Sequence, residues 1–582
     1  MDYNYTDERN VQIVLYLLKA NGIRKVIASP GATNITIVAS MQQDPFFEMY
    51  SCVDERSAAY MACGMAEESG EPVVLSCTGA TSSREYMPGL TEAYYRKLPI
   101  IAITSSQFNS RVGHLITQVT NRSTPPVDTV VGSFCLQPVK DSDDEWDCMI
   151  KMNKAISLLS KQGGGPVHIN LITSYSKNYS IKDLPKTTQI KRVTTHDQFP
   201  ELPKGKIGVF VGSHHKWSQE ETNILDKFCE QHNGVVFCDH TSNYKGKYRV
   251  LPALIGSQED HHDFSFVADL CIHIGEMSGN GAGYWVCNKN VWRVNEDGII
   301  RDTFKTLSYI FEMSETDFFR HYIDNENHSV HSSYYNHCIN VYQSLFLQIP
   351  EDLPFSNLWI AKQITPELPE NSVLHLGILN SLRTWNLFEI PATVSEYSNI
   401  GGFGIDGNLS SLIGASQIHK DKLYFGVFGD LSTFYDINSL ANRHVGNNVR
   451  LLIVNNGKGA EFRMYNHPGA RFGEDTDWYI AAAGHNGNKS EKLLKNFVEN
   501  LGYKYISASN KKEFMQHCDV FLSPVISQSI VFEIFTDNKD ESDSLNIVYH
   551  IAKPHAVDIL KSTVRSIVGQ NGVDKIKEML KK

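Results

Sequence analysis

The sequence of 582 residues has no apolar run that approaches the roughly 20 residues of a membrane-spanning helix. It also has no excess of positive charge, because 54 Lys and Arg stand against 65 Asp and Glu, a net charge of −11. Without a basic cluster or tail, a nucleic-acid partner is not expected, since phosphate binding needs clustered Lys and Arg. The first ten residues, MDYNYTDERN, are polar and acidic, so we expect no signal peptide and a cytoplasmic protein.

The 11 cysteines lack any C-x-x-C spacing. We therefore expect reduced thiols, and neither a disulfide framework nor a zinc site. The sequence also lacks short repeats and low-complexity segments. A chain of this length, with 41% hydrophobic residues, is expected to form three or four folding units of an α/β enzyme.

Short apolar runs alternate with helix-length amphipathic stretches in three successive blocks. Runs that are apolar throughout and are separated by helices predict parallel sheets covered on both faces. The predicted strands lie at 25–29, 48–53, 72–78, 98–105 and 165–172 in the first block, at 206–213, 234–239 and 270–275 in the second, and at 372–379, 422–429, 449–456 and 529–536 in the third. The polar segment 174–203 is predicted to be a linker.

The predicted fold class is therefore α/β, with three doubly wound parallel-sheet domains. We place the first domain at 1–180, the middle domain at 200–345 and the third domain at 354–550. A helical tail is predicted at 551–582.

The strongest motif lies in the third block. Gly429-Asp430-Leu431-Ser432 follows one buried strand, and Asn455-Asn456-Gly457 follows the next, with a helix predicted between them at 432–445. Carboxyl ends of neighbouring parallel strands meet at one edge of a sheet, where ligands bind. Asp and Asn oxygens suit Mg²⁺, whose shell a phosphate can complete, and a helix N-terminus favours an anion. The alternative is two ordinary strand-end turns, which use the same residue types.

These residues resemble the signature of the thiamine diphosphate (ThDP) enzymes, in which Gly-Asp-Gly precedes Asn-Asn by about two dozen residues. The chain departs from it at Leu431, which replaces the third glycine, and in a slightly short spacing. The resemblance implies pyrimidine-binding, middle and diphosphate-binding domains and Mg²⁺ held by Asp430, Asn456 and the Lys458 carbonyl. Flavin is not expected.

In the first block, Ser29-Pro30-Gly31 ends a strand and Glu55 opens an Ala-rich helix. The resemblance implies that the Glu55 carboxylate shares a proton with the pyrimidine ring of the cofactor and so promotes its activation. The alternative is a first-turn carboxylate that complements a helix dipole. The cofactor-binding residues implied by the resemblance are Pro30, Gly31, Glu55, Thr78, Asn380, Ser381, Gly404, Ile405, Gly429, Asp430, Leu431, Ser432, Asn456 and Lys458.

Longer segments resemble the branch that contains the menaquinone-pathway synthase, which joins 2-oxoglutarate to isochorismate. These are SPGATN with DERSAAYMACGMAEESG, SNIGGFGIDGNLSSLIGAS, and GDLSTFYDINSLA. The arginines with which that branch binds acidic substrates are replaced by Thr33, Trp385 and Ile400, with Arg383 two residues before Trp385. Each lost charged hydrogen bond is worth about 1.5–3 kcal/mol, so we expect a different substrate.

The leading hypothesis is a ThDP- and Mg-dependent enzyme that decarboxylates a 2-oxo acid and then protonates the product or adds it to an acceptor, possibly one like a sugar. The alternatives are the menaquinone-pathway synthase itself and a catalytically silent ThDP-fold binding subunit. The predicted catalytic residues are Glu55, Gln118 and Glu461, and the predicted substrate residues are Thr33, His114, Arg383, Trp385, Ile400 and Phe462. The resemblance also implies a homodimer or homotetramer with active sites between chains.

Overall fold

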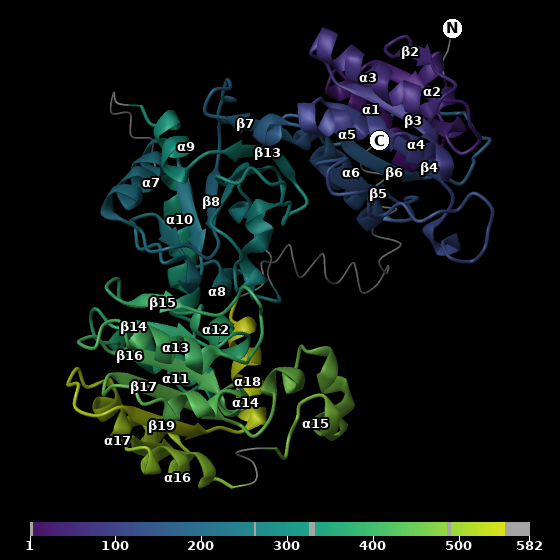
Figure 1. Cartoon of the computed structure of the whole chain (residues 1–582). Helices are drawn as coiled ribbons and strands as arrows, with labels where there is room; N and C mark the ends of the chain where they lie inside the picture. The colour runs from purple at the N-terminus through teal and green to yellow at the C-terminus, as the bar shows by residue number, and fades with distance from the viewer. Residues whose placement is uncertain (1–3, 261–263, 325–331, 486–489, 553–582) are drawn as a thin grey trace, which may run out of the picture. The chain divides into compact units, whose positions relative to one another are not determined.

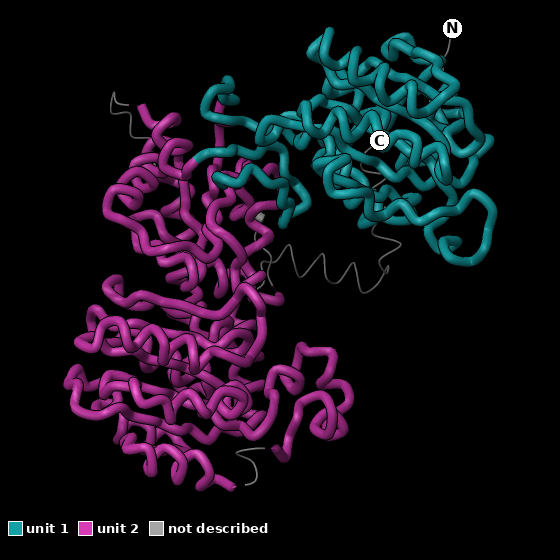
Figure 2. The backbone as a smooth tube through the Cα atoms, viewed as in Figure 1, with its two compact units in different colours: residues 1–200, 295–313 teal, residues 201–294, 314–582 magenta. Residues whose placement is uncertain are grey.

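The computed structural model describes residues 4–260, 264–324, 332–485 and 490–552. The chain divides into two compact units, which Figure 2 colours separately. Unit 1 comprises residues 1–200 and 295–313, and unit 2 comprises residues 201–294 and 314–582. Within the described ranges, no helix is long and apolar enough to cross a membrane.

Unit 1 is built on a six-stranded parallel sheet with the strand order β2-β1-β3-β4-β6-β5 (Figure 1). The strands are β1 (Lys25–Ala28), β2 (Glu48–Ser51), β3 (Val73–Thr78), β4 (Ile100–Ser106), β5 (Gly132–Leu136) and β6 (Val167–Ile172). The helices are α1 (Arg9–Ala20), α2 (Ile35–Gln43), α3 (Glu55–Ser69), α4 (Thr81–Glu85), α5 (Met87–Arg96) and α6 (Ser142–Leu158).

Helices cover both faces of this sheet, because successive apolar side chains of each strand point to opposite sides. Val26, Val74 and Ile101 pack in one core with α1, α2 and α6. Ile27 and Leu75 pack in a second core with α3 and α5. The continuous apolar runs therefore have the physical cause expected from the sequence.

The segment 174–203, predicted as a linker, belongs to unit 1. The Glu8 carboxylate accepts a hydrogen bond from the backbone N–H of Ser174 at 3.0 Å. Strand β7 (Lys191–Thr194) then pairs in parallel with β13 (Leu307–Glu312), also in unit 1. Most of the segment has no helix or strand, but the prediction of a linker missed β7, because the partner of this strand is distant in sequence and leaves no local pattern.

Unit 2 contains two parallel sheets. In the middle sheet the strands β10 (Arg249–Val250), β9 (Gly234–Cys238), β8 (Ile207–Val211), β11 (Leu270–Ile274) and β12 (Val291–Val294) lie in this spatial order. The C-terminal sheet has the order β15 (Ser395–Tyr397), β14 (Val373–Leu376), β16 (Tyr424–Gly429), β17 (Val449–Asn455), β19 (Ile530–Phe535) and β18 (Lys504–Ala508).

Helices connect the strands of both sheets of unit 2. The middle sheet has α7 (Gln219–Gln231), α8 (Ala253–Gly256), α9 (Glu315–Tyr322) and α10 (Ser333–Phe346). The C-terminal part has α11 (Asn357–Ile364), α12 (Asn380–Trp385), α13 (Asn408–Ser416), α14 (Asp430–Tyr435), α15 (Thr476–Tyr479), α16 (Leu493–Asn500), α17 (Lys511–Leu522) and α18 (Asn538–Tyr549). Of the helical tail predicted at 551–582, residues 553–582 lie outside the described residues.

The sheet of unit 1 and the C-terminal sheet of unit 2 have the same topology. If the strands of each sheet are numbered in chain order, both read 2-1-3-4-6-5. The three predicted parallel sheets are confirmed, and the first and third are two copies of one arrangement. In each copy, the first strand in the chain is followed by a strand on one side and then by a strand on the other, which makes a switch point of the kind where ligands bind.

The helix predicted at 432–445 is broken. Helix α14 ends at Tyr435, and a 3₁₀ turn follows at Ile437–Ala441. Between them, the Asp436 carboxylate accepts hydrogen bonds from the backbone N–H and the hydroxyl of Ser410, both at 2.6 Å. The side chain of Asp436 thus holds the chain in a non-helical conformation, with φ of −129°.

The expectation that all 11 cysteines are reduced is wrong for one pair. A disulfide joins Cys271 in β11 to Cys287, at the end of a 3₁₀ segment, and the other nine cysteines are free. The two residues are 16 positions apart, but their Cα atoms lie 5.2 Å apart because the chain returns to β11 after this segment. Local spacing carries no signal for such a pair.

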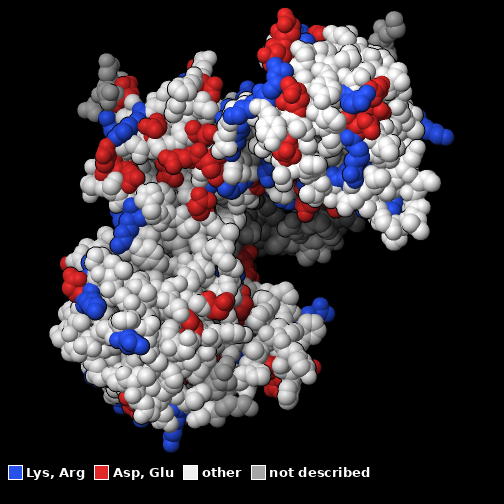
Figure 3. Space-filling model, viewed as in Figure 1, with Lys and Arg blue, Asp and Glu red and all other residues white. Residues whose placement is uncertain are grey.

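Charges of both signs mix on the molecular surface. On the face drawn in Figure 3, acidic and basic side chains are interspersed over unit 1 and over the middle sheet of unit 2. The same face of the C-terminal sheet carries mostly uncharged side chains.

Helices α3 and α5 pack closely at Gly89, where a Cβ would lie 2.5 Å from the Cβ of Ala59. We expect Gly89→Ala to lower the melting temperature, because overpacking costs about 1–3 kcal/mol and the helix-propensity gain is only about 1 kcal/mol. Gly64→Ala in α3 is the matched control, since a Cβ there meets nothing within 4 Å, and it should raise the melting temperature. Equal shifts of the two variants in thermal denaturation would contradict this packing.

Candidate active site

The turns after β16 and β17 meet at one edge of the C-terminal sheet, as the strand pairing of Gly429 with Val454 requires. Asp430 is only 3% exposed, and burial raises the pKa of its carboxyl to about 7. Backbone N–H groups of Leu431, Asp430 and Gly457 hydrogen-bond to the carboxylate and oppose that shift. Gly457 has φ of +75°, so the turn after β17 uses a left-handed conformation that favours glycine.

Asn456 brings a second oxygen to this edge. Its side-chain oxygen is enclosed and has no hydrogen-bond partner among the described residues. A buried carboxylate and an unpartnered amide oxygen fit a hard cation, which supplies the missing interaction. No group of three or more His, Cys, Asp or Glu side chains that could hold a metal occurs in the described ranges, so a cation here would need further oxygens, as Mg²⁺ takes from phosphate.

The loop of Lys458 is held by its own ion pairs. Asp477 accepts from Lys458 Nζ at 2.6 Å and from Arg463 Nη1 at 2.9 Å. The backbone N–H of Gly459 also donates to the Ala481 carbonyl at 2.6 Å. These contacts fix the chain just after Asn456.

Ile405 lies against the Gly-Asp-Leu-Ser turn. Its carbonyl oxygen accepts from the Ser432 hydroxyl at 2.6 Å and from the Asn408 amide at 2.8 Å. The structure therefore brings the segment of Gly404 and Ile405 to the predicted diphosphate turn, although the two are more than twenty residues apart.

Helix α12 places Asn380, Ser381 and Arg383 after β14. Leu379, just before it, has φ of +66°, a strained conformation for leucine that makes the sharp turn possible. Arg383 forms an ion pair with Glu461. With its amide oriented to satisfy both groups, Asn380 also donates to the Glu461 carboxylate and accepts from its backbone N–H at 3.1 Å.

These three predicted residues line one small cavity. It has a volume of about 80 Å³, and Asn380, Arg383, Glu461, Glu541 and Tyr549 are among its lining residues. Burial raises the pKa of Glu541 to about 7 and that of Tyr549 to about 12. The guanidinium of Arg383 is already neutralised by Glu461, so it is not a free binding site for an anion.

Trp385 and Ile400 do not form an open wall of this cavity. Trp385 is fully buried, and its indole N–H donates to the Asn357 side-chain oxygen at 3.1 Å. Ile400 is 4% exposed and packs against Gly279. Phe462 is half-buried and packs edge-on against His467, with 5.3 Å between the ring centroids. The structure does not gather these three side chains.

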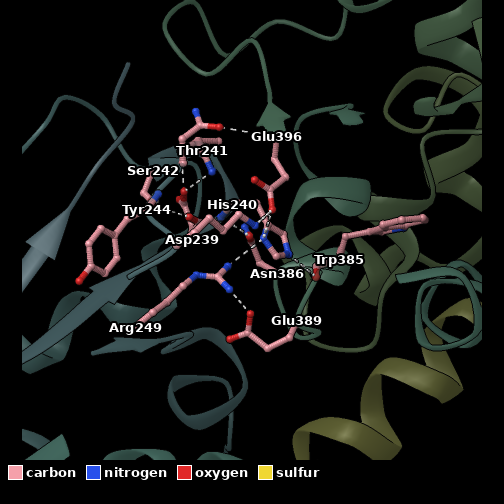
Figure 4. A network of polar contacts seen from close by, with 12 residues as sticks. Asp239, His240, Thr241, Ser242, Tyr244, Arg249, Trp385, Asn386, Glu389 and Glu396 are labelled. Carbon is pink, nitrogen blue, oxygen red and sulfur yellow. Dashed lines mark hydrogen bonds and ion pairs between the residues drawn. The ribbon is translucent and has the colours of Figure 1, made fainter. Parts of the chain in front are cut away.

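A buried polar network holds the end of α12 (Figure 4). His240 donates from Nε2 to the Trp385 carbonyl at 3.0 Å, and its backbone N–H donates to the Asn386 side-chain oxygen at 2.9 Å. Burial and the nearby Arg249 guanidinium lower the pKa of His240 well below its ordinary value, so the ring is neutral. Its Nδ1 therefore accepts, and Arg249 lies 3.4 Å from it.

The neighbouring Asp239 holds a second segment. Its carboxylate accepts from the Ser278 hydroxyl at 2.6 Å and from the Gly279 N–H at 3.1 Å. Gly279 packs so closely on Leu382 of α12 that a Cβ at residue 279 would overlap its side chain. The end of β9 therefore positions both α12 and the turn that packs on it.

In unit 1, Glu55 is the first residue of α3 and is half-buried. Asp54 caps this helix by accepting from the Ser57 N–H at 3.3 Å. Burial raises the pKa of Cys77, at the end of β3, to about 12, and the Glu55 charge adds to the shift. Glu55 thus lies near the carboxyl edge of the sheet, as predicted.

The turn after β1 borders a groove of about 450 Å³. Its lining includes Ser29, Pro30, Gly31 and Asn34. The Asn34 side-chain oxygen is buried and has no hydrogen-bond partner among the described residues. Gly31 touches Thr78 so closely that a Cβ would overlap its methyl group. The predicted residues Pro30, Gly31 and Thr78 therefore meet at one edge.

The remaining predicted residues of unit 1 lie apart from this groove. The Thr33 hydroxyl is buried and donates to the Ser105 carbonyl at 2.7 Å, so it faces the protein interior. His114 and Gln118 are exposed on the loop between β4 and β5, and Gln118 has φ of +63°. No contact given by the structure joins either of them to Glu55.

Sequence reasoning missed Asp239, His240 and Glu541. The predicted strand at 234–239 already placed Asp239 at its carboxyl end, which was a usable signal. Glu541 lies in α18, far along the chain from its partner, the Asn357 N–H at 3.0 Å, and no local pattern marks it.

Comparison with known proteins agrees with the motifs. Residues 9–124 match the family model for the thiamine pyrophosphate enzyme, N-terminal TPP binding domain. A 2-succinyl-5-enolpyruvyl-6-hydroxy-3-cyclohexene-1-carboxylate synthase of Bacteroides fragilis is 28% identical over 573 residues, which cover 94% of this chain and 100% of the relative. The synthase of the same name from Bacteroides thetaiotaomicron is 27% identical over 577 residues, with the same coverage.

A solved structure, the thiamine diphosphate-dependent 4-hydroxybenzoylformate decarboxylase of Rhodococcus jostii RHA1, covers 91% of this chain and 99% of its own. It is 14% identical, with a TM-score of 0.38. The resemblance predicted from the motifs is confirmed: residues 9–124 match the family model for a TPP-binding domain, and the whole chain is similar to the named synthases.

Proposed function

We propose that the chain is a ThDP- and Mg²⁺-dependent enzyme that breaks and forms carbon–carbon bonds of a 2-oxo acid. The observation that carries the proposal is the pair of oxygens at the edge of the C-terminal sheet. Asp430 presents a buried carboxylate beside the turn of Gly457, and the Asn456 amide oxygen is enclosed without a partner. A diphosphate-bound Mg²⁺ satisfies both groups.

The residues of unit 2 would hold the diphosphate end. Asp430, Asn456 and the Lys458 carbonyl would bind Mg²⁺, and Ile405, fixed by Ser432, would support the centre of the cofactor. The other residues assigned to this end are Asn380, Ser381, Gly404, Gly429 and Leu431. When bound, ThDP supplies an electron sink for the carbanion that loss of CO₂ from a 2-oxo acid leaves.

The residues of unit 1 would hold the pyrimidine end. Pro30, Gly31 and Thr78 meet at the carboxyl edge of the sheet, and the Glu55 carboxylate would hold a proton against the ring. Gln118 and Glu461 are assigned to the substrate, and Arg383 is assigned to positioning Glu461 through their ion pair.

The two halves of one active site would come from two copies of the chain. The apolar side chains of Val53 and Tyr60, by the start and middle of α3, are 79% and 48% exposed. In unit 2, Trp478 and Tyr479 of α15 are 76% and 94% exposed. A second copy that covers such surfaces supports a homodimer or homotetramer.

The named relatives favour a specific second candidate, the joining of 2-oxoglutarate to isochorismate. Two separate observations support an uncharged acceptor instead: Arg383 already pairs with Glu461, and the Thr33 hydroxyl faces the protein interior. A catalytically silent binding subunit is the third candidate. The presence of Glu55, Asp430 and Asn456 together argues against it.

Removal of the metal carboxylate tests the cofactor site. Wild-type protein with ThDP and Mg²⁺ should melt at a higher temperature than without them, since ligand at 100 times its Kd stabilises by about 2.7 kcal/mol. Asp430→Asn should abolish the Mg²⁺-dependent part of that shift. Asp421→Asn, at an exposed position that follows α13, is the control and should retain it. Equal shifts in both variants would argue against this metal site.

The Glu55→Gln variant separates binding from catalysis. We expect it to bind ThDP with Mg²⁺, as measured by thermal shift, and to lose CO₂ release at least 100-fold, because the amide does not exchange a proton as a carboxylate does. Glu68→Gln, at an exposed position of the same helix, should retain full activity. Unchanged turnover in Glu55→Gln would remove Glu55 from the mechanism.

A panel of 2-oxo acids distinguishes the three candidate functions. The purified protein with ThDP and Mg²⁺ is incubated with pyruvate, 2-oxoglutarate and aromatic 2-oxo acids, each with and without isochorismate, while CO₂ and adducts are measured. We expect CO₂ from at least one acid without a requirement for isochorismate. An adduct formed only from 2-oxoglutarate and isochorismate would establish the second candidate, and no turnover with intact cofactor binding would establish the third.

A further inference from the structure

Arg122 lies at the carboxyl edge of the unit 1 sheet, and its guanidinium is buried with few hydrogen bonds. It is 7% exposed, and its Nη2 donates to the Asn170 side-chain oxygen in β6. Its Nε and Nη1 are buried and have no hydrogen-bond partner among the described residues. A guanidinium has five N–H donors, so most of this group's hydrogen-bonding capacity is unused.

No carboxylate of the described residues forms an ion pair with Arg122. Burial lowers the pKa of Arg122, the thiols of Cys77 and Cys135 oppose this shift, and the Arg84 guanidinium adds to it. Arg84 Nη2 itself donates to the carbonyl of Asn121 at 3.1 Å. A buried charge that is neither paired nor fully hydrogen-bonded is costly, and an anion is the partner that removes this cost.

The backbone around Arg122 is shaped to admit the guanidinium. Nη1 occupies the space beside Gly79 where any Cβ would overlap it, and the Ser105 carbonyl borders the same space. Gly79, Ser105 and Asn170 come from the carboxyl ends of β3, β4 and β6, or directly follow them. The guanidinium therefore lies across the sheet edge at which open α/β folds bind ligands.

The catalytic carboxylate proposed above lies near the same edge. The thiol of Cys77 at the end of β3 responds to both charges, because Glu55 raises its pKa and Arg122 lowers it, while burial dominates. Burial and the Arg122 charge also lower the pKa of His168 in β6 to about 3, so that ring is neutral and binds Thr104 and Ser133 instead of an anion. Among the described residues, Arg122 is thus a buried cation at this edge with no carboxylate partner, and only its Nη2 is hydrogen-bonded.

We propose that Arg122 binds the carboxylate of a small 2-oxo acid and supplies the anion recognition that Thr33, Trp385 and Ile400 do not. A carboxylate offers two oxygens in the plane of a guanidinium, so it can satisfy two of its donors at once. Arg122 lies on the loop between β4 and β5, which also carries the exposed His114 and Gln118. A bound carboxylate would accept the hydrogen bonds of the two unpartnered nitrogens, Nε and Nη1. The identity of the anion rests on the proposed function, but the binding site does not.

The Arg122→Met variant tests the site in the full-length protein. Without ligand, its melting temperature should rise by about 2–4 °C, because an unpaired buried charge is removed. In the wild type, pyruvate or 2-oxoglutarate should raise the melting temperature, and in Arg122→Met this shift should vanish. Arg122→Lys keeps the charge but not the planar fork, so it should keep only part of the shift.

Arg111→Met is the matched control, since Arg111 is an exposed arginine of the same loop that pairs with Gln107. It should leave both the basal melting temperature and the acid-dependent shift unchanged. Methyl pyruvate, which lacks the charge, should have no effect on any variant. For the acid turned over in the panel, Arg122→Met should raise KM at least tenfold with a smaller change in kcat.

Three outcomes would overturn the inference. The first is a lower melting temperature of Arg122→Met together with an unchanged acid-dependent shift. The second is a shift of the wild type with sodium sulfate equal to that with the 2-oxo acids, which would mean an adventitious ion only. The third is no shift of the wild-type melting temperature with any of the acids. Each measurement is made with and without ThDP and Mg²⁺. If ThDP and Mg²⁺ do not raise the melting temperature of the wild type, this counts against the proposed function. If the 2-oxo acid still raises the melting temperature in those samples, and does so only when Arg122 is present, the anion site is upheld.

Discussion

The central constraint in this protein is a carboxylate that the fold buries without a counter-charge. Asp430 directly follows β16 with 3% of its surface exposed, and among the described residues the groups that act on it are backbone N–H groups and the like charge of Glu533. The adjacent Asn456 oxygen lacks a partner as well. Burial of such groups is unfavourable, which is why the pKa of Asp430 is raised. The cation that we propose at this edge would satisfy both groups. The Ile405 segment and the Asp477 ion pairs then hold the surrounding loops in place.

Unit 1 repeats the topology but carries the opposite charge at its edge. Its sheet has the same strand order as the C-terminal sheet, and its carboxyl edge holds the guanidinium of Arg122 in place of a buried carboxylate. In the proposals made above, one copy of the fold would accept an anion at its edge and the other would accept a cation. This division suits a cofactor with a metal-bound diphosphate at one end and a substrate acid that reacts near the other. The buried Asp239–His240 network adds rigidity to α12, whose residues line the small cavity.

The ion pair between Arg383 and Glu461 bears on whether the chain binds the same substrates as the synthases it resembles. Identity of 27–28% extends over 94% of the chain. At the positions where we expect the substrate arginines of those synthases, this chain has Thr33, Trp385 and Ile400, and the nearby Arg383 is paired with the Glu461 carboxylate. Electrostatic specificity can therefore change while the fold is retained, since ion pairs at a pocket depend on few side chains.

The amino-acid sequence alone determined the parallel sheets and the cofactor motif, because continuous apolar strands and strand-end Asp, Asn and Gly residues are local signals. It predicted that Glu55 opens a helix and that Asp430 and Asn456 follow neighbouring strands, and both placements hold. The break at Asp436, the pairing of β7 with β13 and the disulfide of Cys271 with Cys287 required the tertiary structure, since each joins segments that no periodicity connects. The same is true of Arg122. In the sequence it is one arginine in a polar loop, and only the fold places its guanidinium against Gly79, away from water and from every described carboxylate.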